Sequence, residues 1–319
     1  MYPTSGATIR ADLNFVVEEA SAGEKFLIGL QVLPPMPVDA KSGTYPKLKI
    51  SEAALADAVS TERARGGSYG TISRKWDVDN YDCIDRGLEE AVDDADQKDI
   101  GRFFNLEATA ARLTLRNILY AHEARVAARI LGGFAATAAT VDYTAANQAT
   151  IDFVADILAA IDRIEDQATD ADTIVIPKAV FTRLSLSPKL QAWVRGQLKG
   201  NAEMPVNAEN IAASFADYGI KRVLIGRARQ NTAKKGQAKA MAQIWPNTHI
   251  WVGKTNPGAR MPQDGGAGFT LYWNKEGGIY TSETYRDESK RSNMVRVRQN
   301  TAEKITDPTA GTLIVTNYA

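Results

Sequence analysis

The chain has 319 residues, which is long enough for one large domain or two smaller ones with a hydrophobic core. Its 38 Lys and Arg residues balance 38 Asp and Glu residues, which argues against a protein whose main task is to grip nucleic acid, because such proteins are usually basic. The single cysteine, Cys83, excludes an intramolecular disulfide and fits folding in the cytoplasm, and two histidines are too few for most histidine-based metal or catalytic sites.

Neither a leader peptide nor a membrane segment is predicted. The opening residues, MYPTSGATIRADLN, lack the basic start and following apolar run of a signal peptide. The least polar stretch, residues 126–141, consists mostly of Ala and Gly, contains Arg129, and falls short of the roughly 18 apolar residues that a membrane span needs.

Residues 1–40 show no sustained hydrophobic periodicity, and we predict an extended arm without a core of its own that lies on another surface. Within it, FLIGLQVL (26–33) is typical of one short strand. The sequence PPMP (34–37) is then expected to stop any regular element.

Residues 41–87 favour a long two-stranded hairpin. The segments 43–51 and 71–85 alternate apolar and polar residues, with Ile72, Trp76, Val78 and Tyr81 as candidates for one side. The polar segment between them, 60–70, is rich in glycine and allows a tight reversal. An isolated hairpin is marginally stable in water, so we expect this one to rest on a neighbouring chain.

A short acidic helix is predicted over 88–95, followed by one long helix over 100–131 with Asp99 as its N-cap. At about 1.5 Å per residue this rod would be close to 48 Å long, and Gly132-Gly133 would end it. Its apolar stripe comprises Ile100, Phe104, Ala108, Ala111, Leu115, Ile118, Leu119, His122, Val126 and Ile130. The polar residues Arg102, Asn105, Arg112, Arg116, Glu123 and Arg129 are expected to lie away from that stripe.

The remainder predicts an α/β portion. Residues 150–166 form an amphipathic helix pattern, 173–180 a buried strand, and 181–184, 189–198 and 208–216 short helices. Further strands are predicted over 222–231, 240–254, 268–274, 277–286, 293–305 and 311–318.

Two short motifs fail as ligand sites. The tripeptide GKT (253–255) has Thr248 where a P-loop needs glycine, and the AsnProGly that follows cannot open a helix, so a surface turn is favoured. The segment DVDNYD (77–82) has Tyr81 at a calcium-ligand position, no glycine at the sixth position, and Leu88 in place of the closing glutamate. An exposed acidic strand edge is the better interpretation of that segment.

No reactive side chain stands in an activating context. Cys83, His122 and His249 lie in strand-like or helical runs, and buried packing is favoured for His122. Asp162, Asp166, Asp170 and Asp172 decorate a helix end and its following loop, for which solvated surface is expected. We therefore predict no catalytic, cofactor-binding or metal-binding residues.

The order of the predicted arm, hairpin, long helix and α/β portion resembles that of a known protein family. Three stretches contribute most: YDCIDRGLEEAVDDAD (81–96), IVIPKAVFTRLSLSPKLQAWVRG (174–196) and SETYRDESKRSNMVRVRQNTAEKITDPTAGTLIV (282–315). With the arm, hairpin and long helix, they resemble the major capsid proteins of tailed bacteriophages. The resemblance implies an α+β, Hong Kong 97-type fold: arm 1–40, E-loop hairpin 41–87, peripheral domain with its spine helix 88–133, axial domain 134–275, and closing strands of both domains 276–319.

The resemblance also implies function and partners. It implies a structural protein, not an enzyme, that assembles into hexamers and pentamers of an icosahedral head around double-stranded DNA, without a cofactor and without a membrane partner. The chain opens almost directly into the arm, so a separate scaffolding protein is expected, with a portal and a decoration protein as further partners. DNA would meet the shell through non-specific phosphate contacts. The expected location is the virion capsid, assembled in the host cytoplasm.

The charged run 284–298 is either a solvated loop or a subunit contact, in which paired charges would fix register. Two alternatives to the phage coat remain open: an encapsulin-type shell around cargo protein, and an α/β enzyme with an unrecognised site. Some relatives crosslink a hairpin lysine to a distant asparagine, but we assign no such chemistry to Lys75. The candidate interface residues are Glu62, Arg63, Arg65, Arg74, Lys75, Arg286, Asp287, Glu288, Lys290 and Arg291.

Overall fold

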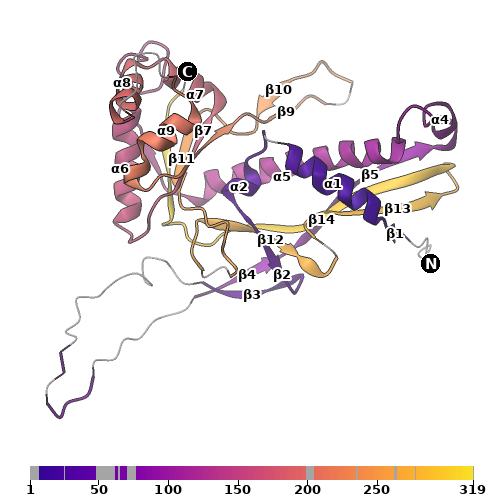
Figure 1. Cartoon of the computed structure of the whole chain (residues 1–319), viewed down its shortest axis with the longest axis horizontal. Helices are drawn as coiled ribbons and strands as arrows, with labels where there is room; N and C mark the ends of the chain where they lie inside the picture. Colours follow the sequence, from indigo (N-terminus) through magenta and orange to yellow (C-terminus); the bar gives the residue numbers. More distant parts are fainter. Residues whose placement is uncertain are drawn as a thin grey trace.

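The structure is a computed structural model that describes residues 7–24, 26–47, 62–63, 65–69, 77–198, 205–234, 236–261, 264–276 and 278–318. Figure 1 shows two sheets at different places along the molecule, joined by one long helix that lies against both. The predicted hairpin residues Ile72, Arg74, Lys75 and Trp76 lie outside the described residues.

A five-stranded sheet with flanking helices forms one end of the molecule (Figure 1). In spatial order its strands are β6 (Ala136–Ala138), β15 (Gly311–Val315), β11 (His249–Gly253), β7 (Thr173–Pro177) and β8 (Arg222–Gly226). The helices are α6 (Phe153–Glu165), α7 (Lys178–Ser185), α8 (Pro188–Gln197) and α9 (Ala208–Ser214). Phe153, Phe215 and Ile250 are buried between helices and sheet, as the predicted α/β portion requires.

A six-stranded sheet forms the elongated part of the molecule. Its path runs through β1 (Thr8–Ile9), β13 (Thr281–Asp287), β14 (Ser292–Ile305), β12 (Gly268–Trp273) and β2 (Pro35–Val38), and β5 (Ile84–Asp93) also pairs with β14. The strand β12, predicted to belong with the axial portion, is paired with β14 and β2 instead. The predicted boundary at 275 therefore cuts through a sheet that the C-terminal strands complete.

The long helix α5 runs from Leu106 to Gly133, 28 residues or about 42 Å. The predicted start at residue 100 is wrong, because residues 100–104 form turns in which Ile100 and Phe104 are exposed. The N-cap is Asn105, whose side chain accepts a hydrogen bond from the Ala108 amide at 3.1 Å. From Ala111 to Ile130 the predicted stripe is buried, and the stripe is confirmed over that length.

The acidic helix predicted over 88–95 is wrong. Residues Ile84–Asp93 are β5, which pairs antiparallel with β14 in a ten-residue register, and the short helix α4 follows at Asp94–Asp99. Asp93 ends the strand and caps the helix, accepting a hydrogen bond from the Ala95 amide at 2.7 Å. The pairing partner decides this conformation, because the charged residues of β5 do not themselves favour a strand.

The N-terminal segment differs from the predicted arm. It contains helices α1 (Ala11–Gly23) and α2 (Gly29–Val32), the latter where a short strand was expected. The strand β2 includes Pro35 and Pro37, which an edge strand tolerates because it pairs on one side only. Leu13, Val17, Val32, Leu33 and Met36 are all buried against the rest of this chain. The expected extended conformation is therefore wrong, whereas the described residues of this segment do lie on another surface, which belongs to their own chain.

The predicted hairpin strands are confirmed where they are described. Strand β3 (Ser42–Lys47) pairs antiparallel with β4 (Asp77–Asp82). Val78 is 68% exposed and Tyr81 half-buried, so these two do not share the side predicted for them. Figure 1 places the described tip segment, residues 62–63 and 65–69, far from both sheets. A second ribbon, β9 (Arg229–Asn231) with β10 (Met241–Gln243), interrupts two predicted strands and projects beyond the long helix.

Candidate functional site

The predicted interface residues of the hairpin tip are exposed. Arg63 donates to the Gly67 carbonyl at 2.7 Å, and its guanidinium lies 4.9 Å from the centre of the Tyr69 ring. Glu62 and Arg65 are solvent-exposed, while Arg74 and Lys75 lie outside the described residues. The tip thus presents both charge signs and one aromatic ring with 71% of its surface exposed.

The other predicted interface residues gather at the turn between β13 and β14, at the opposite end of the molecule (Figure 1). Arg286 donates to both carboxylate oxygens of Asp94 at 2.6 Å, and this pairing raises the Arg286 pKa. Lys290 lies 3.4 Å from Asp287, and Glu288 accepts from Arg286 at 3.3 Å. Arg291 closes the turn at φ 49°. The structure brings these five residues together, with partners in their own chain, but not near the tip.

Two expectations about surface residues are wrong. Thr255 of the GKT motif is 3% exposed, not part of a surface turn. Asp172 is half-buried and accepts from the Thr255 amide at 2.8 Å and the Thr173 hydroxyl at 2.7 Å. Arg222 also donates to Thr255. These hydrogen bonds connect the ends of β7, β8 and β11. The other three aspartates, Asp162, Asp166 and Asp170, are exposed, as predicted.

The isolated reactive side chains are packed, not activated. Cys83 is fully buried, with its Sγ 3.8 Å from the Leu271 carbonyl, and burial raises its pKa to about 11. The thiol is therefore a poor nucleophile at neutral pH. Among the described residues, no group of three or more His, Cys, Asp and Glu side chains could hold a metal ion. Nor is any described helix long and apolar enough to cross a bilayer.

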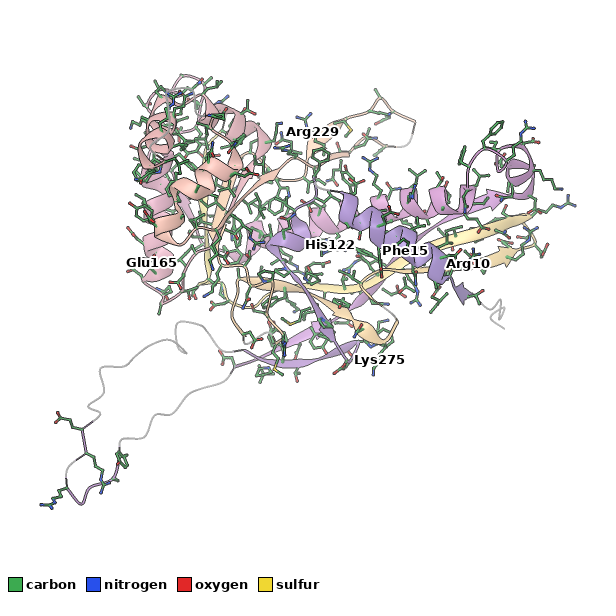
Figure 2. The ribbon with its side chains drawn as sticks, in the orientation of Figure 1. Arg10, Phe15, His122, Glu165, Arg229 and Lys275 are labelled. Carbon is green, nitrogen blue, oxygen red and sulfur yellow. The ribbon has the colours of Figure 1, made fainter. Side chains whose placement is uncertain are left out.

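A charged cluster lies between α5 and the six-stranded sheet, where Figure 2 shows His122 inside the molecule. His122 is 2% exposed, and the prediction that it is buried is confirmed. Its Nε2 lies 3.7 Å from Glu303 Oε1, to which Arg125 Nε donates at 3.1 Å. Burial would raise the Glu303 pKa, but Arg125, His122 and Arg86 outweigh it and the pKa is lowered.

His122 makes stability depend on pH in a defined window. Burial, assisted by Arg125 and Arg86 and opposed by Glu303, lowers its pKa to about 4. Between that value and the ordinary pKa of about 6.5, the unfolded chain binds a proton at His122 that the folded chain does not. The free energy of unfolding should therefore fall as pH drops through this window, by up to about 3 kcal/mol from this residue.

Urea unfolding of the wild type and His122→Gln at pH 7, 6, 5 and 4.5 measures this contribution. The variant removes the titrating group, so the stability difference between the two proteins should shrink as pH falls. Other carboxylates titrate in both proteins and cancel in the difference. A difference that stays constant across the window would contradict the assignment.

Glu123 is a second residue that is buried against expectation. It was expected away from the apolar stripe, yet it is 1% exposed. Its Oε1 accepts from the Ile28 amide at 3.1 Å and Trp245 Nε1 at 2.6 Å, and its Oε2 from the Gly29 amide at 2.6 Å. A Cβ on Gly29 would lie 2.7 Å from Oε2. In the sequence, the one feature that indicates burial of Glu123 is that it directly follows His122, which belongs to the apolar stripe.

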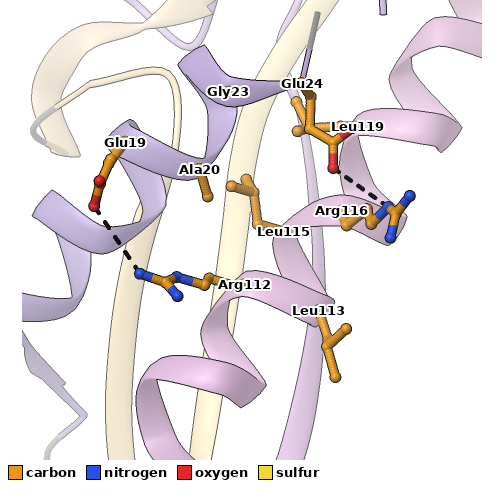
Figure 3. A pocket seen from close by; sticks show the side chains of 9 residues that line it. All are labelled: Glu19, Ala20, Gly23, Glu24, Arg112, Leu113, Leu115, Arg116 and Leu119. Carbon is orange, nitrogen blue, oxygen red and sulfur yellow. Dashed lines mark ion pairs between the residues drawn. The ribbon is translucent and has the colours of Figure 1, made fainter. Parts of the chain in front are cut away.

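A shallow groove of about 460 Å³ runs between α1 and α5 (Figure 3). Arg116 lies 3.3 Å from Glu24 and Arg112 lies 4.0 Å from Glu19, so ion pairs bridge the two helices. Leu115 and Leu119 line its floor, and both are buried. The groove joins the N-terminal segment to the long helix and presents no catalytic arrangement of side chains.

Comparison with known proteins identifies the fold. No family model and no curated protein matches the sequence. A phage-related protein from Bordetella bronchiseptica RB50 is 18% identical, with 98% of both chains covered and a TM-score of 0.71. The capsid structure of cyanophage P-SCSP1u is 12% identical, covers 90% of this chain and 86% of that one, and has a TM-score of 0.55. The chain has the Hong Kong 97-type coat fold.

A virus-like particle from Pyrococcus furiosus has the same coat fold, at 11% identity and a TM-score of 0.55, with 95% of this chain and 97% of that chain covered. The predicted α+β coat fold is thereby confirmed. Following the expected division of the chain, we call α5 the spine helix and β3 with β4 the base of the E-loop. At identities of 11–18%, the shared feature is the shape of the subunit, not the chemistry of particular residues.

Proposed function

We propose that this protein is the major capsid protein of a tailed bacteriophage, a structural and non-catalytic subunit that assembles into hexamers and pentamers around double-stranded DNA. The observation that carries the proposal is the match along 98% of the chain to a phage-related protein with the coat fold. The matched capsid structure of a cyanophage supports the same role.

The shape of the subunit supports assembly. The E-loop base is a two-stranded sheet, and its described tip lies away from the body (Figure 1). A two-stranded ribbon is marginally stable in water, so surface from neighbouring copies would stabilise it. Contacts in which one surface of a copy meets a different surface of the next close into rings when the rotation permits. Because the described residues between 7 and 40 pack on their own chain, the E-loop alone would need surface from neighbouring copies.

Partners follow from the proposed role. A separate scaffolding protein would guide assembly, a portal would occupy one vertex, and a decoration protein could bind the finished shell in the virion. Packaged DNA would be met by non-specific contacts with its phosphates. Assembly would take place in the host cytoplasm.

Expression, size-exclusion chromatography and negative-stain imaging test the proposal. We expect shells, rings or isolated capsomers, the last forming shells when a scaffold is supplied. A compact small oligomer that never forms rings or shells would contradict it and favour the enzyme alternative. The contents of purified particles separate the two shell types, because a phage coat packages DNA and an encapsulin-type shell encloses protein.

The E-loop tip gives a sharper prediction. The triple variant Glu62→Lys, Arg63→Glu, Arg65→Glu should lower the assembled fraction by about tenfold or more, because reversed charges at a contact replace attraction by repulsion. The isolated subunit should unfold at the wild-type urea concentration, since all three side chains are exposed. Sedimentation velocity and urea titration provide the two measurements.

The variant Arg163→Glu changes one exposed residue of the helical end and lowers the net charge by two, as the tip variant does; it is the matched control and should leave assembly unchanged. Normal assembly of the tip variant would remove the tip residues from the proposed interface. The turn residues Arg286, Asp287, Glu288, Lys290 and Arg291 remain candidates for a separate contact, as do Arg74 and Lys75.

A further inference from the structure

The ribbon β9–β10 is an ordered projection with a firm base. At its base, Ala228, Ile244 and Trp245 are buried, and the Ile244 amide donates to the Ala228 carbonyl at 3.0 Å. Farther out, the side-chain oxygen of Asn231 accepts from the Ala240 amide at 3.0 Å. Figure 2 shows Arg229 on this ribbon, where it leaves the body. The ribbon is thus preformed and does not fold back onto its own chain.

The ribbon lies within a long segment of the sequence whose charged residues are all basic. Residues 221–263 contain nine basic residues and no Asp or Glu. The chain as a whole is neutral, so the rest of it carries an excess of nine acidic residues. Four basic side chains of the ribbon and its approach are exposed and, within the described parts of the chain, have no carboxylate at ion-pair distance: Arg227, Arg229, Lys234 and Lys239.

The opposite long edge of the molecule carries the complementary charge. There β3 and β4 form the E-loop base, and Figure 1 shows this base and the ribbon on opposite sides of the long helix. The described side chains of residues 39–46 and 77–82 include one lysine, Lys41, and four aspartates, Asp39, Asp77, Asp79 and Asp82. Asp39 and Asp82 are exposed, and neither makes an ion pair with a described residue.

We propose that the basic ribbon β9–β10 of one copy docks on the acidic E-loop base of the next copy. The inference rests on the proposed function, since it names one contact by which copies would associate. The two surfaces lie on opposite edges, so the contact is heterologous and repeats from copy to copy until a ring closes. Each surface is a two-stranded ribbon that gains from a neighbour, and opposite charges set partner and register.

The direction of the ribbon favours a protein partner over nucleic acid. Figure 1 looks down the shortest axis of the molecule, and the ribbon extends beyond the outline in that view. It therefore extends within the plane of the two longer axes of the molecule. In a closed shell one molecule thick, neighbouring copies would lie in this same plane. A site for DNA packaged inside a shell would instead occupy one of the two broad faces.

A charge-swap experiment tests the contact. The ribbon variant Arg229→Glu, Lys239→Glu and the base variant Asp39→Lys, Asp82→Lys should each raise the concentration needed for half-maximal association by about tenfold. The variant that combines all four changes in one chain should return to within about twofold of wild type, because ribbon and base are complementary again. Sedimentation velocity at 50 mM NaCl measures association, and thermal melting checks that each variant folds.

The control variant Arg163→Glu, Lys178→Glu changes the net charge as much as the ribbon variant and should associate like wild type. Failure of the combined variant to recover would overturn the contact. So would unchanged association of the ribbon variant accompanied by loss of binding to a 30-base-pair DNA, which would assign the ribbon to nucleic acid.

Carbodiimide crosslinking of the wild type with mass spectrometry gives a direct readout. Linked peptides should join Lys234 or Lys239 of one copy to Asp39, Asp79 or Asp82 of another, and their absence from associated material would overturn the contact. If the wild type never associates, the proposed function fails together with the contact. If it associates and the swap has no effect, the contact alone fails.

Discussion

Glu123→Ala is expected to lower the free energy of unfolding by about 3–5 kcal/mol, because it leaves three buried donors without an acceptor. These donors are the amides of Ile28 and Gly29 and the indole nitrogen of Trp245. They come from the N-terminal segment and from the base of the β9–β10 ribbon. One carboxylate therefore ties both to the spine helix, and its loss should loosen the N-terminal segment first.

Urea unfolding measures the loss, and hydrogen exchange locates it. The Ile28 and Gly29 amides should exchange much faster in the variant, while those of β7 and β11 keep their protection at low urea. Burial raises the Glu123 pKa although the three hydrogen bonds act in the opposite direction, which means that the buried carboxylate itself is unfavourable. Its removal in Glu123→Ala therefore offsets part of the stability lost with the hydrogen bonds.

Two further variants separate the bonding role of Glu123 from side-chain size. Glu123→Gln keeps one acceptor oxygen but turns an amide group toward donors, and should fall between wild type and alanine. Glu165→Ala removes an exposed glutamate from α6 and should change stability by less than about 0.5 kcal/mol. Equal effects of Glu123→Ala and Glu165→Ala would show that the buried bonds contribute nothing.

Ala121→Pro is the second change with a large expected effect, a loss of about 3 kcal/mol or more. Ala121 is exposed in the middle of the spine helix, so the substitution removes no buried contact. Proline lacks the amide that would donate to the Asn117 carbonyl, and its ring clashes with that carbonyl. The resulting kink falls between two parts of the helix with different tasks.

The spine helix connects the two sheets through its two halves. Leu115 and Ile118 pack with Val295 and Val297 of the six-stranded sheet. Val126 and Ile130 pack in the cluster that contains Trp251 and Leu313 of the five-stranded sheet. A kink at residue 121 should therefore change the angle between the sheets, and a subunit with the wrong angle should not close into shells.

Ala121→Gly is the matched control, since it keeps the amide and should cost about 1 kcal/mol. Urea unfolding gives the stability of both variants, and negative-stain imaging shows whether shells form. If the proline variant assembles as well as the glycine variant, the helix does not act as a rigid connection between the sheets.

Local patterns in the sequence were sufficient where a single element buries one face. The three- and four-residue steps from Ala111 to Ile130 predicted the buried stripe of α5, and the helix of 150–166 and the strand of 173–180 were predicted within a few residues. In these elements the spacing of apolar residues is itself the signal. The order of such elements also carried the resemblance to the coat fold.

Only part of the candidate interface could be predicted from sequence patterns. Exposed charges at a glycine-rich tip can be recognised in sequence, and Glu62, Arg63 and Arg65 are indeed exposed. The partners of Arg286 could not be recognised, because Asp94 lies 192 positions away and meets it only across paired strands. The separation of the basic ribbon and the acidic E-loop base onto opposite edges likewise exists only in the folded chain.

Residue patterns were enough to predict the α+β class of fold, the long helix and the paired strands at the base of the hairpin. They were not enough to predict that 84–93 is a strand, that the N-terminal segment packs on its own chain, or that Glu123 is buried. The physical reason is the range of the interactions. Helical and strand periodicity depends on neighbours a few residues apart, whereas β5 needs β14, and Glu123 needs donors 94, 95 and 122 positions away.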